Sequence, residues 1–273
     1  MNWFQALIVG IVEGLTEYLP VSSTAHILLT QRLLGIEQSE ASDAYAIVIQ
    51  AGAIAAVLGI YAKRVWEMLQ GVAGRNPAGL RLAIQVVVAF LPAMVFGLLF
   101  NKKIKDHLFH LGPICWAWFI GGLVILAFAA WRRRRPDAGK SIADLTIGAA
   151  VMIGLLQCLG MIPGTSRSLV TILGGLLVGL NMAAALEFSF LLGLVTLSAA
   201  TVHDAYKHGP AMLRQYDAIT MAIGFAGAAI AAFISVKWML SYLRRHGLAV
   251  FGWYRIALAA VVGWLIFTGK LTP

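Results

Sequence analysis

The chain has 273 residues, of which 60% are hydrophobic and only 12% are charged. A soluble globular domain carries about 25% charged residues, so this composition excludes an ordinary soluble protein and predicts an integral membrane protein. The net charge of +9 does not indicate nucleic-acid binding, because the basic residues cluster in short segments between apolar runs, a pattern that orients membrane proteins.

The first apolar stretch, residues 2–35, is interrupted in its middle by LPVSSTAH, which contains Pro20. A proline removes a helix hydrogen bond and forces a break. Two short helices around a break are typical of a re-entrant hairpin, which enters the bilayer and leaves on the same side. An ordinary kinked helix is the alternative, since neighbouring groups often satisfy the backbone at a membrane proline. We expect the hairpin.

Two glutamates, Glu13 and Glu17, precede this break and share one face of a helix because they are four residues apart. Carboxylates inside a membrane are costly and usually mark a functional site. Their repulsion can be relieved by a proton on one of them, by a basic side chain, or by a hard divalent cation such as Mg²⁺ or Ca²⁺. Simple solvation accounts for them only if the hairpin is shallow.

Six further apolar runs are long enough to cross a bilayer, which takes roughly 20 residues. These runs are 44–62, 82–100, 112–131, 183–202, 218–236 and 248–269. Only Glu187 and Arg255 interrupt them with a charge. The connections 63–81, 132–141 and 237–247 hold twelve lysines and arginines, against seven in the other connections and ends. This bias predicts that these three connections are cytoplasmic and that both termini face outward.

A second interrupted stretch, residues 145–179, contains the break PGTSRSLVT and predicts a second hairpin. In this break Arg167 lies between Ser166 and Ser168. Arginine is a permanent cation whose planar fork grips phosphate oxygens, and hydroxyls and free N–H groups at a helix start add donors. An ion pair of Arg167 with one of the glutamates, without chemistry, is the other explanation.

Each half of the chain thus contains one hairpin and three spans, about 1–131 and 142–273. A hairpin does not change sides whereas three spans do, so the second half must enter from the opposite face. We therefore expect a single all-α membrane domain, 1–273, with about six transmembrane helices and two re-entrant hairpins in an inverted-topology repeat. The two breaks would meet near the midplane. Inverted repeats are also a transporter architecture, so a transporter or flippase of a lipid phosphate or small anion is the alternative function.

Together, the two breaks offer what phosphoryl transfer requires, which is charge neutralisation and a positioned nucleophile. Arg167, with a divalent metal on Glu13 and Glu17, could supply the first. Ser23 with His26 as base, His26 itself, or a metal-activated water could supply the second, and the sequence does not choose among them. Further phosphate contacts are expected from the hydroxyl groups at the breaks, those of Ser22, Thr24, Ser166 and Ser168.

The motifs EGLTEYLPVSSTAH and PGTSRSLVT resemble the two long motifs of the bacterial undecaprenyl pyrophosphate phosphatases, the bacitracin-resistance family. The similarity continues through IVIQAGAIAAV and LEFSFLLG and covers nearly the whole chain. Ala25 and Leu169 stand where glycine is common in the family.

This resemblance implies a metal-dependent hydrolase of the bacterial inner membrane. The expected reaction converts undecaprenyl pyrophosphate to undecaprenyl phosphate and inorganic phosphate, which recycles the carrier lipid for peptidoglycan synthesis and confers bacitracin resistance. The expected partners are a polyprenyl diphosphate lipid and the bilayer, with a homodimer left open and no nucleic acid, and we expect the active site to face the periplasm. The family's catalytic groups match Glu13, Glu17, Ser23, His26 and Arg167 here.

Overall fold

The structure, a computed structural model, describes residues 1–36, 39–132 and 139–271, which form α-helices and two short 3-10 helices without any β-strand among them. In chain order the helices are α1 (Trp3–Thr16), α2 (Ser23–Leu33), α3 (Glu40–Ile60), α4 (Ala62–Val72), α5 (Pro77–Leu108), α6 (Leu111–Arg132), η1 (Ile142–Asp144), α7 (Ile147–Gln157), η2 (Cys158–Met161), α8 (Arg167–Leu177), α9 (Met182–Gln215), α10 (Ala218–His246) and α11 (Ala249–Phe267). The long helices α5, α6, α9, α10 and α11 are each apolar enough to cross a membrane. The expected fold class is confirmed: the chain is an all-α, multi-pass membrane protein.

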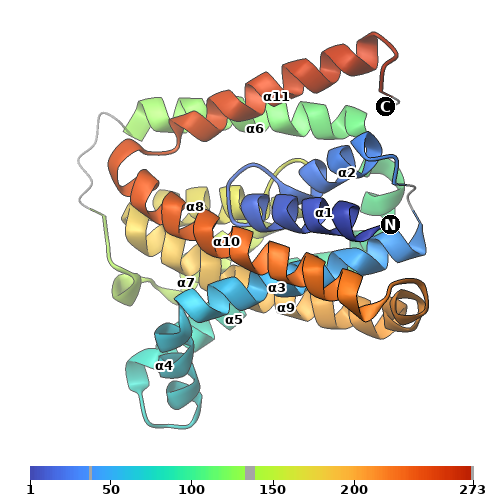
Figure 1. Cartoon of the computed structure of the whole chain (residues 1–273). Helices are drawn as coiled ribbons and strands as arrows, with labels where there is room; N and C mark the ends of the chain where they lie inside the picture. Colours follow the sequence, from blue (N-terminus) through green and yellow to red (C-terminus); the bar gives the residue numbers. More distant parts are fainter. Residues whose placement is uncertain (37–38, 133–138, 272–273) are drawn as a thin grey trace.

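Both expected hairpins are present, and each returns to the place where it starts. In the first, the Gln5 side chain on α1 donates to the carbonyl of Leu34 at the end of α2, at 3.1 Å. In the second, the N–H of Lys140 donates to the carbonyl of Gly179, at 2.8 Å, so the chain before α7 lies beside the end of α8. The two hairpins open toward opposite ends of the molecule (Figure 1). The division into the repeats 1–131 and 142–273 stays a prediction.

Short polar side chains fix where several helices begin. Asn2 accepts from the N–H of Gln5, whose side chain bonds back to Asn2, which is a capping box at the start of α1. Asn76 caps α5, whose first residue is Pro77, at a position where the missing N–H of proline does no harm. Asp217 caps α10 in the same manner.

Two of the expected connections are largely helical, and here the sequence prediction was wrong. Residues 63–81 contain most of α4 and the start of α5, and 237–247 are mostly the last turns of α10. At the end of α10, Arg244, Arg245 and His246 favour the helix, because they complement its negative C-terminal pole. The span expected over 44–62 corresponds to α3, and the chain bends by 82° at its end, between α3 and α4. This bent pair is the sixth candidate span beside the five long helices.

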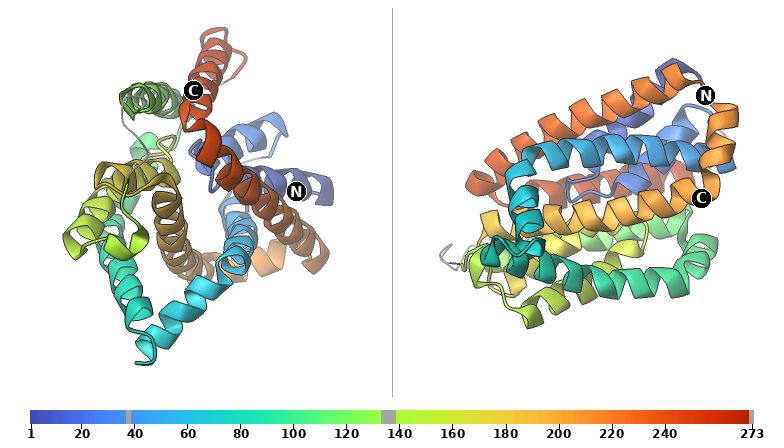
Figure 2. Two further views of the ribbon diagram at one scale, coloured as in Figure 1. Left: turned by 90° about the vertical axis from the view of Figure 1, so that its left-hand side faces the viewer. Right: turned by 90° about the horizontal axis from the view of Figure 1, so that it is seen from below.

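Two of the three connections predicted to be cytoplasmic, 63–81 and 237–247, share one end of the molecule (Figures 1 and 2), and most of the third, 132–141, lies outside the described residues. Helix α4 and the junction between α10 and α11 lie at this end, whereas both chain termini lie at the other. This arrangement agrees with the relative placement that the distribution of basic residues predicted.

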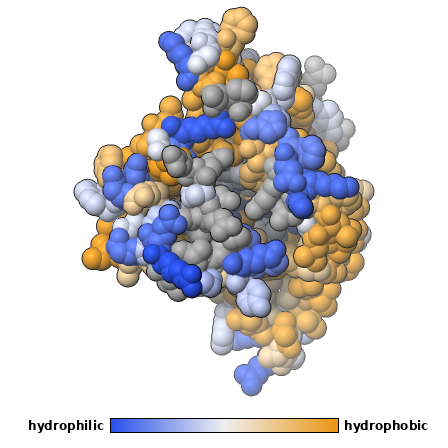
Figure 3. All heavy atoms as spheres, turned by 90° about the vertical axis from the view of Figure 1, so that its right-hand side faces the viewer, coloured by the Kyte–Doolittle hydropathy of each residue, from blue (hydrophilic) through white to orange (hydrophobic). Residues whose placement is uncertain are grey.

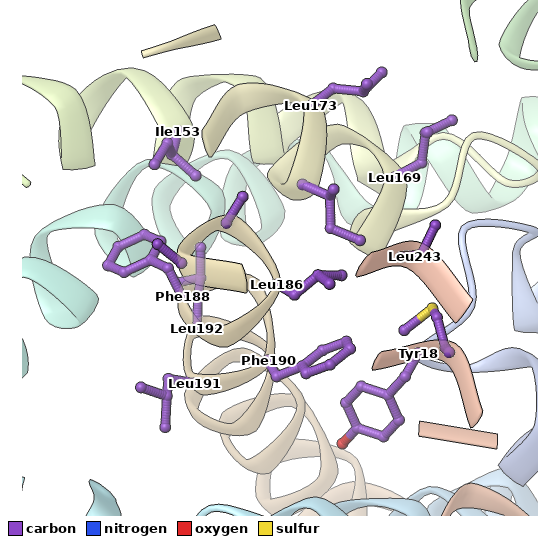
Figure 4. Packing of buried hydrophobic residues seen from close by; sticks show 14 of the residues in the cluster. Tyr18, Ile153, Leu169, Leu173, Leu186, Phe188, Phe190, Leu191, Leu192 and Leu243 are labelled. Carbon is purple, nitrogen blue, oxygen red and sulfur yellow. The ribbon is translucent and has the colours of Figure 1, made fainter. Parts of the chain in front are cut away.

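Close helix contacts bring the two breaks into the interior. Helix α1 packs on α10 through glycine, and a Cβ atom on Gly14 would lie only 2.2 Å from the carbonyl oxygen of Ala228. Small residues let membrane helices approach closely in this way. On the other side, Leu169 and Leu173 of α8 belong to the same buried cluster as Phe190 of α9, and Tyr18 meets Phe190 edge to face with ring centroids 5.5 Å apart (Figure 4).

Candidate active site

The two breaks share an unusual backbone conformation. Ser22 has φ 74° and Ser166 has φ 77°, and they are the only residues other than glycine with positive φ in the described part of the chain. Each immediately precedes a helix, α2 or α8. Such a conformation costs roughly 1–3 kcal/mol per residue and persists where the surroundings enforce it, often at functional sites. The strain therefore marks both breaks as places where backbone geometry matters.

The two breaks are hydrogen-bonded directly to each other. The N–H of Gly164 donates to Ser22 Oγ at 3.2 Å, and Ser168 Oγ donates to the carbonyl of Leu19 at 2.9 Å. Ser166 Oγ lies 2.9 Å from Ser168 Oγ and accepts from the N–H of Leu169 at 3.3 Å. Three of the hydroxyls expected to bind phosphate are therefore engaged within the protein.

Glu17 is the centre of a buried polar chain. Its Oε1 accepts from Arg167 Nη2 at 2.9 Å, with side-chain exposures of 8% and 12%. Its Oε2 accepts from the hydroxyl of Ser23. Arg167 also donates to the carbonyl of Ser189 on α9 at 3.3 Å. The structure thus brings together three of the five residues that the family resemblance predicts to be catalytic.

His26, another of these five residues, is turned toward Tyr254 of α11. Its Nδ1 lies 2.7 Å from the carbonyl oxygen of Ser22, so Nδ1 carries the proton, because a carbonyl can only accept. Its Nε2 lies 2.8 Å from the hydroxyl of Tyr254, and the two rings are stacked at 5.8 Å between centroids. Trp118 meets the His26 ring edge to face. The hydrogen bond of the Ser23 hydroxyl is to the Glu17 carboxylate and not to His26.

The sequence reasoning did not identify Tyr254. It lies in an apolar run, where a tyrosine is ordinary, and only the packing of α11 brings it to His26, 228 positions away in the chain. Its side chain is 45% exposed, so the His26–Tyr254 pair borders the surface.

Buried polar atoms without a partner gather at this site. Within the described residues they are Glu13 Oε2, the Tyr18 hydroxyl and Arg167 Nε. Glu13 lies one helical turn before Glu17, and Arg167 Cζ lies 5.7 Å from the centre of the Tyr18 ring. About nine in ten buried polar groups in proteins are bonded, so three orphans in one place indicate a site that is completed by a polar ligand.

The remaining predicted positions can now be placed. Thr24 is exposed on the first turn of α2, where its hydroxyl is accessible. Ala25 is fully buried in the cluster that contains Trp118, and Leu169 is packed in the main core. At both positions where the family commonly has glycine, the side chain of this protein is therefore packed among apolar residues.

Comparison with known proteins connects this geometry to a family. Residues 6–261 match the family model described as bacitracin resistance protein BacA. The chain is 49% identical over 267 residues to an undecaprenyl-diphosphatase of Sorangium cellulosum, covering 97% of this chain and 87% of that protein. It is 45% identical over 263 residues to an undecaprenyl-diphosphatase of Methylococcus capsulatus, covering 96% and 94%. It is 44% identical over 258 residues to undecaprenyl-diphosphatase 2 of Rhodospirillum rubrum, covering 94% and 93%. The chain therefore belongs to the bacitracin resistance protein BacA family.

Proposed function

We propose that this protein hydrolyses undecaprenyl diphosphate to undecaprenyl phosphate and inorganic phosphate, and thereby recycles the carrier lipid and confers bacitracin resistance. The relatives at 44–49% identity are undecaprenyl-diphosphatases by name, which supports the reaction class. The observation that carries the proposal is the buried chain from the Ser23 hydroxyl through the Glu17 carboxylate to the Arg167 guanidinium. This chain joins a nucleophile, a base and a phosphate-binding cation at one point.

The geometry supports Ser23 as the nucleophile. Its Oγ attacks the terminal phosphorus while its proton passes to Glu17, and the bond from this phosphorus to the bridging oxygen breaks. The bridging oxygen leaves with the electron pair as undecaprenyl phosphate. Water then attacks the phosphoserine phosphorus, Glu17 returns its proton to Ser23 Oγ, and phosphate leaves while the proton of the water goes to solvent. An adjacent base of this kind is what activates a serine hydroxyl.

Arg167 supplies the charge that the reaction needs. Phosphoryl transfer is catalysed mainly by positioning and by neutralising charge on the phosphoryl oxygens. Nη1 and Nη2 already donate to Ser189 and Glu17, whereas Nε has no partner among the described residues. Nε therefore has an N–H available to donate to a phosphoryl oxygen, and the bonds to Ser189 and Glu17 hold the guanidinium in orientation.

We propose that a divalent metal, Mg²⁺ or Ca²⁺, assists binding. The described residues contain no cluster of three or more histidine, cysteine or carboxylate ligands. Glu13, however, has a buried oxygen without a partner beside Glu17. Mg²⁺ is commonly held by one or two carboxylates together with substrate phosphates, and this donor set fits that mode. Glu13, with Glu17 beside it, would hold the ion, which when bound would neutralise charge on the diphosphate.

The test is phosphate release from undecaprenyl diphosphate by purified protein in detergent, where a transporter has no compartments between which to work. Wild type should release phosphate, and Ser23→Ala should lower the rate by about 1,000-fold or more. The control is Ser241→Ala, on the exposed surface of α10. Acid quenching during turnover should trap phosphate on Ser23. No release by wild type would overturn the phosphatase proposal, and full activity of Ser23→Ala would overturn the mechanism.

We further propose that the protein lies in the bacterial inner membrane with its site open to the periplasm. The first hairpin opens at the end that carries both termini (Figure 1), opposite the end with most of the basic connections. Several groups of hydrophilic side chains lie on that end, and hydrophobic side chains predominate along one of its sides (Figure 3). In intact cells, a membrane-impermeant maleimide should label Thr24→Cys but not Ser241→Cys at the opposite end. The reverse pattern would reject this orientation.

A further inference from the structure

One buried cation remains outside the mechanism. Arg255 lies in the apolar helix α11 and is fully buried. A charge inside a membrane protein is costly and ordinarily pairs with an opposite charge or lines a functional path. Within the described part of the chain, however, Arg255 forms no salt bridge with a carboxylate.

Its partners are backbone carbonyls, and they come from three places. On α6, it donates to Ala117 at 2.9 Å and to Trp118 at 3.4 Å. At the first break it donates to Pro20 at 3.2 Å. At the second break it donates to Gly164 at 2.8 Å and to Thr165 at 3.1 Å. These five bonds match the five N–H donors of a guanidinium.

The two breaks are held at equivalent positions. Pro20 lies three residues before Ser23, and Gly164 lies three residues before Arg167. A planar group that bonds both carbonyls fixes the separation of the two breaks, and with it the distance between the nucleophile and the phosphate-binding cation. A bulky apolar side chain could fill the same space but could not donate hydrogen bonds to the carbonyls of both breaks.

We propose that Arg255 is a positioning residue of the active site, which sets the distance between Ser23 and Arg167 through the backbone of both breaks. This inference rests on the proposed phosphatase function. The inference adds that catalysis depends on the Arg255 guanidinium, which does not touch the substrate, as well as on Arg167 and the proposed metal ion.

The neighbouring helix offers a way to displace this guanidinium without changing it. Gly121 of α6 lies directly against Arg255, and a Cβ atom there would be 2.2 Å from Nη2 and 2.8 Å from Cζ. Gly121→Ala therefore forces the guanidinium to move, and no residue of the Ser23–Glu17–Arg167 chain is altered. Gly112 on the same helix has no atom within 4 Å of an added Cβ, so Gly112→Ala is the matched control.

The experiment compares kcat and KM for a short-chain polyprenyl diphosphate in wild type, Arg255→Lys, Gly121→Ala and Gly112→Ala, together with melting temperatures. We expect kcat to fall about 30–100-fold in Arg255→Lys and in Gly121→Ala, because a displacement of about 1 Å between catalytic groups can lower the rate about 100-fold. Gly112→Ala should keep the wild-type kcat. KM should change less than about threefold and the melting temperature by only a few degrees, since the site remains assembled. A purely structural role would lower the melting temperature and the yield of folded protein but leave kcat per folded molecule unchanged.

Wild-type kcat in either folded variant overturns the inference. Failure of both variants to fold also overturns it, because Arg255 would then serve folding alone. An inactive wild-type protein would instead refute the phosphatase function itself, so the two failures are distinguishable.

Discussion

Gly193 on α9 should be as important for activity as a catalytic residue, although it has no functional group. It lies directly against Arg167, and a Cβ atom added there would be 1.9 Å from Nη1, 2.7 Å from Cζ and 2.9 Å from Nη2. Carbon and other heavy atoms rest about 3.5–4.0 Å apart, so in Gly193→Ala the guanidinium must move by more than about 1 Å. The 2.9 Å bond from Nη2 to Glu17 and the 3.3 Å bond from Nη1 to Ser189 cannot both survive this movement.

The expected loss can be stated as a magnitude. A misplacement of about 1 Å in a catalytic site can lower the rate by about 100-fold. At 1.36 kcal/mol per factor of ten, this loss corresponds to about 2.7 kcal/mol of transition-state stabilisation. Helix propensity acts in the opposite direction, because alanine is favoured over glycine by about 1 kcal/mol in a helix interior. Gly193→Ala should therefore remain folded while it loses activity.

The assay is kcat/KM for phosphate release, measured beside the thermal unfolding of each purified variant. Gly148→Ala on α7 is the control, since an added Cβ at Gly148 meets no atom within 4 Å. The control should keep wild-type kcat/KM. If Gly193→Ala also keeps it, the orientation of Arg167 seen in the structure does not govern the reaction, and the reasoning is refuted.

Three further predictions concern the surroundings of the site. Tyr254→Phe removes the hydroxyl that bonds His26 Nε2, and should lower kcat about threefold to tenfold, the equivalent of one neutral hydrogen bond, with KM unchanged; an unchanged kcat would separate the pair from catalysis. Glu13→Gln should raise the metal concentration needed for half-maximal rate by at least about tenfold, as titration with Mg²⁺ and Ca²⁺ after chelation would measure, and an unchanged requirement would remove Glu13 as a ligand. Asp217 caps α10, and its bonds to the backbone N–H and hydroxyl of Thr220 lower the pKa of its carboxyl. Because this folded-state pKa is depressed, the charge stabilises the protein above the ordinary value of about 3.9 and ceases to do so as the pH falls through the folded pKa. Asp217→Asn should therefore melt below wild type at pH 7, and the two melting temperatures should converge as the pH falls through the lowered folded-state pKa.

Much of this architecture is readable from sequence because a bilayer imposes strong constraints. An uncharged apolar run of about 20 residues predicts a transmembrane helix. A polar, proline-containing break inside such a run can form few structures, because its backbone groups must be satisfied within the bilayer. The two breaks could be matched because each presents a hydroxyl-rich turn before a helix. Glu17 and Arg167 stood out because ionisable groups are rare in such surroundings, and the structure joins them at 2.9 Å.

The rest depends on helix packing that no local pattern encodes. Gly193 and Gly121 are two of 28 glycines in the sequence. Gly193 contacts Arg167 only because α9 packs on α8, and Gly121 contacts Arg255 only because α6 packs on α11. Arg255 was visible as a charge in a span, but its partners are carbonyls, which every residue has. The serines of the breaks were expected to contact phosphate, and several instead bond the other break. Backbone groups exposed at a break inside the bilayer must find partners within the protein, and short hydroxyl side chains are the nearest available.

The charges of the site explain why a carboxylate pair can serve an anionic substrate. Glu17 is bonded to Arg167, but Glu13 keeps a buried oxygen that no described group satisfies. A diphosphate that approaches this oxygen is repelled unless a positive charge arrives with it, either as a proton on the carboxylate or as a metal ion. Glu13 would then act less as a permanent metal ligand than as a reason for substrate and cation to bind together. Because coupling between two ligands is reciprocal, a cation that tightens diphosphate binding must itself be held more tightly by the diphosphate. On this view, the two carboxylates would be sufficient to hold a metal ion only together with the substrate, whose own phosphates would complete its set of ligands.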